Sequence, residues 1–378
     1  MAWLAGIPVY NILVFLVVLT ILVFVHELGH YLCARRNGVR VQMFSIGFGA
    51  EIFGWTDRAG TRWKLSMIPL GGYVKMFGDA DASSMPSDTV EEMTEAERAV
   101  SFFHKRLMQR IEIVAAGPVA NFLFAIVVFA GLFMTVGQPF TPPDIGEVSK
   151  GSAAERSGIQ PHDVILSLDG KTVERFEDIQ KVVFLNAGVP ISIAVRRGDA
   201  VLTLTATPDI VEEKDILGNV HRIGRLGILR AGTSYVRQDP LSAVWRAGSE
   251  TWNVAAGTLT AVGQMIMGTR TTDELGGPIG IAQISGVVAR TGVVNLLAFM
   301  AMLSVNLGLI NLFPIPILDG GHLLFYAAEA VRGRPLGQRA QEYGFRVGLA
   351  LVLTLMIFAT WNDLVHLRIV EFVKGLVT

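Results

Sequence analysis

The stretch LVFVHELGHYLCARRNGVR, from Leu22 to Arg40, places two histidines and a glutamate near the end of an apolar run. This run begins near Pro8 and is long enough to cross about 30 Å of hydrocarbon as a helix. Ionisable groups inside a membrane helix cost on the order of 2.5–3.5 kcal/mol each on insertion, so they are rare and usually functional. The stretch therefore predicts a membrane protein with a buried chemical site.

The composition of the whole chain agrees with this prediction. Of its 378 residues, 51% are hydrophobic and only 17% are charged, and the formal net charge is −1. This composition favours a multipass membrane protein. The basic residues are scattered, so we expect no nucleic acid as a partner. Cys33 is the only cysteine, which excludes an intrachain disulfide; we interpret it as an apolar filler, with a zinc-ligating thiolate as the alternative.

Four apolar segments predict four transmembrane helices, at residues 8–33, 105–136, 293–320 and 343–364. No Lys or Arg precedes Arg35, so the first segment lacks the basic region of a cleaved signal peptide and is expected to remain in the mature protein. Clusters of Lys and Arg flank the segments on one side, which predicts cytoplasmic loops at 34–104 and 321–342. The region 137–292 and a tail at 365–378 are then outside.

The first cytoplasmic loop contains two runs rich in aromatic and β-branched residues, RVQMFSIGFG and RWKLSMIPLGGYVKMFGD. Gly71-Gly72 is a two-residue turn signal, so we expect a β-hairpin with its tip at SMIPLGGYV. A hairpin on a soluble loop is one interpretation. The tip is unusually apolar for exposed sequence, however, which suggests that it enters the membrane or a protein cavity.

The outside region divides into two parts. Strand-like runs and turns alternate over residues 144–208, with turns at Asp169-Gly170 and Arg197-Gly198, which predicts a small αβ or all-β domain. Residues 240–267 place apolar groups at helical spacing but contain Arg246 and Glu250. We therefore expect an amphipathic helix lying on the membrane or on the domain rather than a fifth span.

His26-Glu27-Leu28-Gly29-His30 is a complete HExxH motif. On a helix, positions i and i+4 share one face, so both imidazoles can reach one metal ion while Glu27 points beside it at a bound water. Zinc lowers the pKa of that water to near neutrality, and the glutamate takes its proton and passes it to the leaving amine. The motif therefore predicts peptide hydrolysis.

A catalytic zinc ion keeps three protein ligands, so a third must come from elsewhere in the chain. The candidate is Asp319 in NLGLINLFPIPILDGGH, because it lies near the same cytoplasmic boundary as His30 and needs a cationic partner. Pro314 and Pro316 open the helix, which lipid would not tolerate unless that backbone lines a cavity. The alternatives are that Asp319 is a helix N-cap, or that His322 is the ligand instead.

Three asparagines also stand in apolar runs. Hydrogen bonding between helices is the ordinary explanation for Asn121 and Asn306. Asn311 is two helical turns before Asp319, close enough to bind the substrate backbone or the oxyanion.

HELGH on the first span, together with NLFPIPILDGG on a late one, resembles the site-2 protease family of intramembrane zinc metalloproteases. Four spans with an outside insertion between the second and third resemble its bacterial regulator-of-sigma-E protease branch. The segment IGEVSKGSAAERSGIQPHDVILSLDGKTV resembles a bacterial PDZ domain, expected at 140–235 and followed by amphipathic helices at 236–292. One such domain is visible, whereas the best-known enterobacterial relatives have two.

The resemblance implies Zn²⁺ held by His26, His30 and Asp319, with Glu27 as the catalytic acid/base and Asn311 as a substrate-contacting residue. It also implies that TRWKLSMIPLGGYVKMFG is a membrane-reentrant β-hairpin whose edge pairs with an unwound substrate by strand addition. The further candidate substrate-binding residues are Gly71, Gly72 and Tyr73. The implied location is the bacterial inner membrane, with the active site near the cytoplasmic face and the PDZ domain in the periplasm.

The leading functional hypothesis is regulated intramembrane proteolysis. The substrates would be single-span proteins, such as an anti-sigma factor or a signal-peptide remnant, that a site-1-type protease has already cut outside. A non-catalytic scaffold with a structural metal site and a PDZ-like sensor is the alternative, but the sequence offers no compelling fourth ligand to close such a site. A transporter would predict broken helices in both halves, and we find only one.

Overall fold

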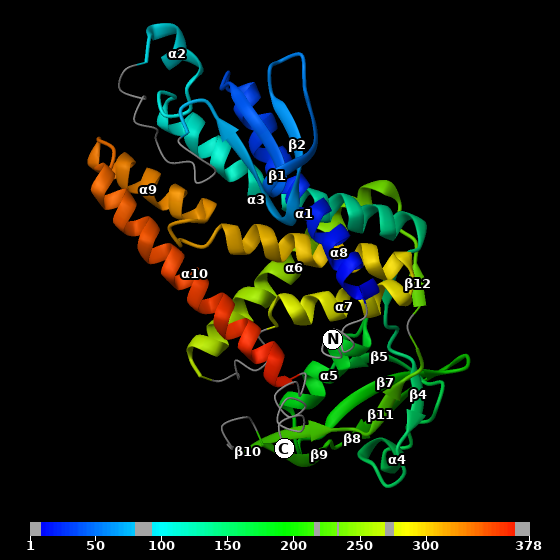
Figure 1. The fold of residues 1–378 in the computed structure, drawn as a ribbon. Helices are drawn as coiled ribbons and strands as arrows, with labels where there is room; N and C mark the ends of the chain where they lie inside the picture. Colours follow the sequence, from blue (N-terminus) through cyan, green and yellow to red (C-terminus); the bar gives the residue numbers. More distant parts are fainter. Residues whose placement is uncertain (1–8, 80–92, 215–219, 233, 269–275, 367–378) are drawn as a thin grey trace, which may run out of the picture. The chain divides into compact units, whose positions relative to one another are not determined.

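The computed structural model describes residues 9–79, 93–214, 220–232, 234–268 and 276–366, and the chain forms two compact units (Figure 1). The first, which we call the membrane unit, comprises the described residues of 1–131, 244–262 and 272–378. The second, which we call the αβ unit, comprises those of 132–243 and 263–271.

Four helices in the described part of the chain are long and apolar enough to cross a membrane, which confirms the predicted number. Val18 and Leu22 of the first pack against Met300 of the third in an apolar cluster. Other side chains, such as Val127 and Ile357, are apolar and exposed, as expected for helices surrounded by lipid. The helices are α1 (Val9–Arg36), α3 (Leu107–Thr135), α8 (Val293–Asn311) and α10 (Gln338–His366).

The segment 293–320 is not one continuous helix. α8 ends at Asn311, and a separate helix, α9 (Asp319–Arg332), begins after the prolines. Because Pro314 and Pro316 cannot donate backbone hydrogen bonds, the chain makes tight local turns, in which the amide of Leu318 donates to the carbonyl of Ile315. The region expected as the loop 321–342 therefore contains most of α9 and the start of α10.

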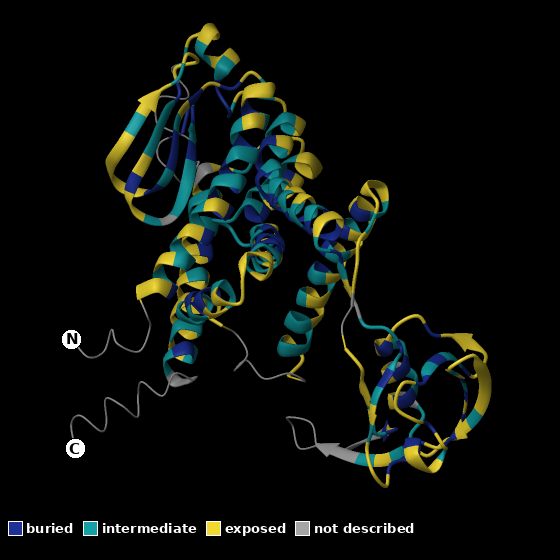
Figure 2. Ribbon diagram, turned by 90° about the vertical axis from the view of Figure 1, so that its right-hand side faces the viewer, coloured by how far each residue is buried: buried dark blue, intermediate teal, exposed yellow. Residues whose placement is uncertain are grey.

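The strands β1 (Val41–Thr56) and β2 (Arg62–Met76) form an antiparallel hairpin, as expected. Both strands bend, so Phe44 pairs with Trp63 on one side and with Val74 on the other. The segment 72–76 consequently lies at an edge of the sheet, beyond 41–46. Residues 48–53, in the middle of β1, are exposed (Figure 2). They include the large apolar residues Phe48, Ile52 and Phe53.

The predicted position of the hairpin turn is wrong. The chain reverses at residues 57–61, where the Asp57 carboxylate accepts hydrogen bonds from the amides of Ala59 and Thr61. Gly71 and Gly72 lie within β2 instead. A Cβ at Gly72 would lie 2.8 Å from Ser45 O and 2.8 Å from Val23 Cγ1. Here glycine permits close approach of a strand to its neighbours, a need that a sequence pattern does not distinguish from a turn.

Two further helices precede α8, namely α6 (Pro240–Ile266) and α7 (Pro278–Arg290), and a short one, α2 (Glu95–Val100), precedes α3. Within the membrane unit, α6 is amphipathic: Thr251 and Ala255 are buried, whereas Trp252 is exposed. Thr258 Oγ1 donates a hydrogen bond to Asn306 Oδ1 of α8 at 2.9 Å. This part of α6 thus packs on a spanning helix, and Asn306 makes the helix-to-helix hydrogen bond that the sequence predicts.

The αβ unit is small and mixed, in agreement with the prediction for residues 144–208. Its largest sheet has the order β6-β5-β7-β8, with α5 covering an apolar core that includes Ile165, Ile179 and Ile193. Turns occur at Asp169-Gly170 and at Gly198, all three with positive φ. The elements are β3 (Gln138–Phe140), β4 (Ile145–Val148), α4 (Ala153–Arg156), β5 (Val164–Leu168), β6 (Lys171–Thr172), α5 (Phe176–Leu185), β7 (Ile191–Arg197), β8 (Ala200–Ala206), β9 (Asp209–Lys214), β10 (Val220–Arg225), β11 (Ile228–Arg230) and β12 (Ser234–Val236).

Candidate metal centre and active site

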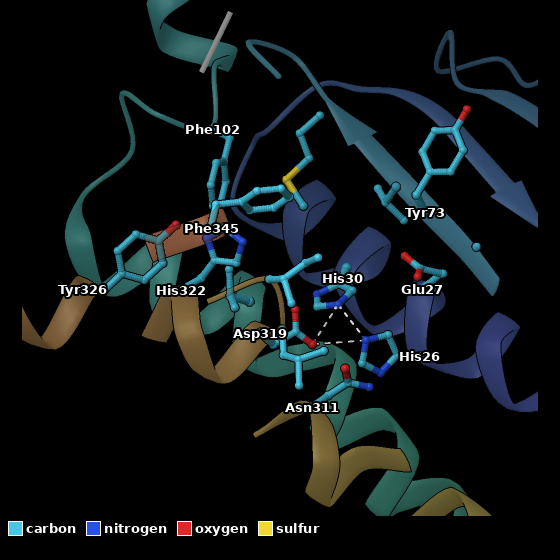
Figure 3. A pocket seen from close by; sticks show the side chains of 16 residues that line it. His26, Glu27, His30, Tyr73, Phe102, Asn311, Asp319, His322, Tyr326 and Phe345 are labelled. Atoms are coloured by element: carbon cyan, nitrogen blue, oxygen red, sulfur yellow. Dashed lines mark hydrogen bonds and ion pairs between the residues drawn. The ribbon is translucent and has the colours of Figure 1, made fainter. Parts of the chain in front are cut away.

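Three side chains from two helices converge in the membrane unit (Figure 3). His26 and His30 project from α1, and Asp319 is the first residue of α9. Asp319 Oδ2 lies 3.1 Å from His26 Nε2 and 3.5 Å from His30 Nε2, and the two Nε2 atoms are 3.2 Å apart. Among the described residues, these three form a group whose ligand atoms could hold one metal ion.

The spacing of the three atoms fits a tetrahedral zinc ion. Ligand atoms at about 2.0–2.1 Å from zinc lie about 3.3 Å from one another in a tetrahedron, and the three separations bracket that value. Asp319 Oδ2 is also buried without a hydrogen-bond donor from the described residues. A buried carboxylate oxygen without a donor needs a cation, so the donor set and the geometry both suit zinc.

The alternatives for the third ligand can be compared with this geometry. Leu318, not Asp319, occupies the N-cap position of α9. His322 lines the same cavity but lies outside the three-residue group. Cys33 neither lines this cavity nor belongs to the group. In the described part of the chain no fourth His, Cys, Asp or Glu joins the group, which leaves one tetrahedral position open, as in catalytic zinc sites.

Helix α3 holds the two imidazoles from behind. His30 Nδ1 donates to the carbonyl oxygen of Ile113 at 2.9 Å, which leaves the Nε2 lone pair of the neutral ring directed at the other ligands. Gly117 provides the space for the rings, because a Cβ there would lie 2.3 Å from His30 Nε2 and 2.9 Å from His26 Cε1. On the same helix, Asn121 contacts His26 Nδ1.

Glu27 is buried beside the three-residue group and is not part of it. Its nearest neighbours across the site come from the edge segment of β2. A Cβ at Gly72 would lie 3.2 Å from Glu27 Cγ, and Val74 of the same segment lines the cavity together with Glu27. The glutamate therefore lies between the ligand atoms and the edge of a sheet.

The three candidate ligands and Glu27 line one cavity of about 540 Å³. Of the predicted substrate-binding residues, Gly72, Tyr73 and Asn311 line it; Gly71 does not. The Asn311 side chain donates to the carbonyl of Leu307 at 3.0 Å, so in this structure its amide nitrogen is engaged by its own helix. The cavity is closed on the α9 and α10 side by residues that sequence reasoning did not single out, namely Tyr326 and Phe345.

Sequence reasoning also missed the roles of Gly117 and of Asn121 toward the histidines. The sequence assigns Asn121 to hydrogen bonding between helices and gives Gly117 no role. Their partners lie on α1, more than eighty residues away, and no local pattern names such a partner.

Comparisons with known proteins agree with the site. The model of the peptidase family M50 matches residues 14–355. A Rhizobium meliloti protein provisionally named a zinc metalloprotease is 47% identical over 94% of this chain and 96% of its own length. The metalloprotease MmpA of Caulobacter vibrioides is 42% identical over 96% of this chain and 97% of its own length.

A solved PDZ domain, from the SdrC-like protein of Listeria monocytogenes, matches 24% of this chain and 88% of that domain, with 15% identity and a TM-score of 0.19. A score this low supports no conclusion about the αβ unit. The family match and the relatives, by contrast, cover nearly the whole chain. The chain therefore belongs to peptidase family M50, the site-2 protease family of membrane zinc metalloproteases.

Proposed function

We propose that this chain is a zinc-dependent intramembrane endopeptidase that performs regulated intramembrane proteolysis. The observation that carries the proposal is the convergence of His26, His30 and Asp319 on one cavity with Glu27 beside them. In this proposal the first three residues hold zinc and Glu27 is the catalytic acid/base. Zinc held there would supply Lewis-acid activation at neutral pH.

The residues of the chain would do the rest of the chemistry. Glu27 accepts the proton of the attacking water and returns it to the nitrogen of the leaving amine, so that the peptide bond breaks without an unstable charged leaving group. Its position between the ligands and β2 suits a substrate that lies along the cavity. Asn311, on the cavity wall, could turn its amide from Leu307 to the substrate backbone.

The edge segment 72–76 of β2 is the proposed substrate-docking strand. A helical peptide bond is shielded by its own turn, so a transmembrane substrate must unwind before it can be cut. An extended segment can then pair with a sheet edge through main-chain hydrogen bonds. Gly72 and Tyr73 lie both on this edge and on the cavity, which supports their assignment to substrate binding.

The proposed substrates are single-span membrane proteins, such as an anti-sigma factor or a signal-peptide remnant, after an upstream site-1-type protease has cut them. We place the enzyme in a bacterial inner membrane. Arg35 and Arg36 at the end of α1, and Arg110 near the start of α3, support a cytoplasmic location for this end of the helices. The αβ unit is then periplasmic and PDZ-like, and a groove of about 440 Å³ between α5 and residues 224–229 is available to a peptide.

Glu27→Gln tests the proposed chemistry. The purified protein and this variant would be reconstituted in proteoliposomes with a single-span substrate, and zinc content would be measured in parallel. We expect equal zinc content and a cleavage rate lower by about 10²–10⁴-fold, the usual contribution of a general acid/base. Equal cleavage by both proteins would remove the role of Glu27. Absence of cleavage by both proteins, with zinc bound, would favour the alternative function of a non-catalytic scaffold with a structural metal site.

The proposed orientation is tested separately by labelling of single cysteines in a Cys33→Ala background. Cysteines placed at Lys171, an exposed residue of β6 in the αβ unit, and at Arg58, on the exposed turn of the hairpin, should react with an impermeant reagent from opposite sides of the membrane. Labelling of both from one side would contradict the topology.

A further inference from the structure

Asn121 is the buried polar residue closest to the back of the His26 ring. It lies on α3 and is fully buried, and its backbone carbonyl accepts a hydrogen bond from Ser304 Oγ of α8 at 2.9 Å. Its side-chain Nδ2 is drawn 3.1 Å from His26 Nδ1, and its Oδ1 is buried without a partner among the described residues. The amide therefore makes one side-chain hydrogen bond, and it makes it to a ring that belongs to the metal site.

The direction of that hydrogen bond decides what His26 can do. A neutral imidazole carries one proton, so donation from Asn121 to Nδ1 would leave the proton on Nε2, the atom that faces Asp319 Oδ2. A protonated Nε2 has no lone pair for a metal ion. Turning the side-chain amide by 180° exchanges Oδ1 and Nδ2, which are nearly identical in shape. No hydrogen bond of Oδ1 is lost, because this atom has no partner among the described residues. The oxygen then accepts Nδ1–H, and the Nε2 lone pair faces the other ligands.

The second histidine already shows the arrangement that this inference requires. His30 Nδ1 donates to the carbonyl oxygen of Ile113, one of the oxygens on the same helix. Ile113, Gly117 and Asn121 are four residues apart along α3 and so lie on one face. Ile113 offers its carbonyl oxygen to His30 Nδ1, and a turned Asn121 amide would offer its oxygen to His26 Nδ1 in the same way. The glycine between them leaves space for both rings. One face of α3 therefore serves as a template for both imidazoles.

We propose that Asn121 is a positioning residue whose side-chain oxygen accepts the Nδ1 proton of His26 and so fixes this ring with its Nε2 lone pair toward zinc. This inference rests on the ligand set of the proposed function. Partners behind metal-bound histidines typically contribute about 10–100-fold to metal affinity. Asn121 does not itself line the substrate cavity, so its effect should appear in zinc affinity first.

The test is zinc affinity of the full-length protein in detergent, measured by competition with a chromophoric chelator. Asn121→Leu removes the oxygen at similar volume and should weaken zinc binding about 10–100-fold. Asn121→Asp offers only acceptor atoms and should bind zinc at least as tightly as the parent protein. Ser304→Ala is the matched control, because it removes a neighbouring buried hydrogen bond that does not reach the ring, and it should leave the affinity unchanged.

Unchanged zinc affinity in Asn121→Leu would overturn the inference. Equal weakening of zinc binding in the Leu and Asp variants would also overturn it, because the amide N–H of Asn121, and not its oxygen, would then be the group that His26 requires. Asn121→Ala, measured alongside, replaces the Leu variant if the latter does not fold. His26→Ala separates this inference from the proposed function. If that variant keeps zinc, the proposed ligand set has failed; if it loses zinc while Asn121→Leu keeps it, only the role of Asn121 has failed.

Discussion

Asp319 has a buried carboxylate oxygen, Oδ2, and Asp363 is buried as a whole residue in the same membrane unit. The two carboxylates have opposite kinds of partner. Asp363, on α10, accepts hydrogen bonds from three backbone amides at the start of α7, those of Gly277, Ile279 and Gly280, at 2.8–3.0 Å. Asp319 directs Oδ2 at two imidazole nitrogens and receives no hydrogen bond there from the described residues. A carboxylate at a helix N-terminus is satisfied by amide dipoles, whereas one among lone pairs requires a cation.

The difference teaches that burial of a charge does not by itself identify a functional site. Both carboxylates are costly to place in a membrane helix, and this cost alone would identify both as candidate functional residues. Only the partner atoms separate them. Asp363 joins two helices, and Asp319 completes a set of ligands. Substitutions at the two positions should therefore change different observables.

The largest effect is expected for Asp319→Asn. An amide oxygen is a much poorer zinc ligand than a carboxylate, so we expect loss of stoichiometric zinc and a cleavage rate lower by more than about 100-fold, since even partners behind the ligands contribute 10–100-fold. Mass spectrometry measures the zinc content, and cleavage of a single-span substrate measures the rate. Asp363→Asn is the matched control and should keep its zinc; loss of zinc from both variants alike would remove the distinction.

Gly117→Ala should have the next largest effect. Its new methyl group would meet His30 Nε2 and His26 Cε1, so the rings must move. We expect zinc affinity to weaken about 10–100-fold. Gly280→Ala is the comparison at the other carboxylate, where a Cβ would lie 2.8 Å from Asp363 Oδ1. Chelator competition should show normal zinc affinity in this second variant; a weakened affinity there would show that the two regions are coupled.

Asp363→Asn should lower the stability of the membrane unit. At least one of the three amides loses its acceptor, which costs about 1–3 kcal/mol per buried donor. The measurement is thermal unfolding in detergent, followed through the tryptophans, with the protein zinc-loaded. An unchanged midpoint would mean that the contact between α10 and α7 contributes little, and Asp363 would then need another explanation.

The smallest effect concerns a third kind of carboxylate, Asp163 in the αβ unit. Burial opposes its ionisation, but Arg197, at 2.8 Å, and the amide of Gln160 donate to it and hold its pKa below the usual value. A carboxylate with a lowered pKa in the folded state stabilises the fold at pH values above its unfolded-state pKa of about 3.9. This stabilisation is lost as the pH falls through the folded-state pKa.

We therefore expect the free energy of unfolding of the αβ unit to fall by about 1 kcal/mol between about pH 5 and about pH 3. The effect is small because Arg197 is partly exposed to solvent. Hydrogen exchange at the amides of β5 and β7 would measure it in the full chain. Asp163→Asn should flatten this pH dependence, and an equally steep loss in the variant would assign it to other groups. The zinc site should be unaffected by this variant at neutral pH.

Much of the site could be predicted from the sequence because its signals are local. The i, i+4 spacing of His26 and His30 fixes their common face, and the apolar run around them makes a chance match improbable. Pro314 and Pro316 mark the break that brings Asp319 to a helix start. The strands and turns of the αβ unit follow from alternation and from Gly170 and Gly198.

The remainder depends on contacts between distant segments. Gly71-Gly72 has the composition of a turn, but Gly72 is needed where β2 passes α1 and Gly71 lies against the ring of Phe48. The observed turn is built by Asp57. Asn121 reads as an ordinary interhelical asparagine until His26 is seen 3.1 Å away. The extent of α9 was not predicted either, because residues 321–342 were expected to form a loop, whereas the helix continues to Arg332.

Zinc-edge X-ray absorption on the purified protein tests the central claim most directly, because it reports the ligands of the metal without relying on activity. The account predicts only nitrogen and oxygen ligands at about 2.0–2.1 Å, including two imidazoles, and loss of the bound metal in Asp319→Asn. A sulfur ligand at about 2.3 Å would bring in Cys33, and an unchanged spectrum in Asp319→Asn would exclude this carboxylate. Either result would contradict the site described for His26, His30 and Asp319.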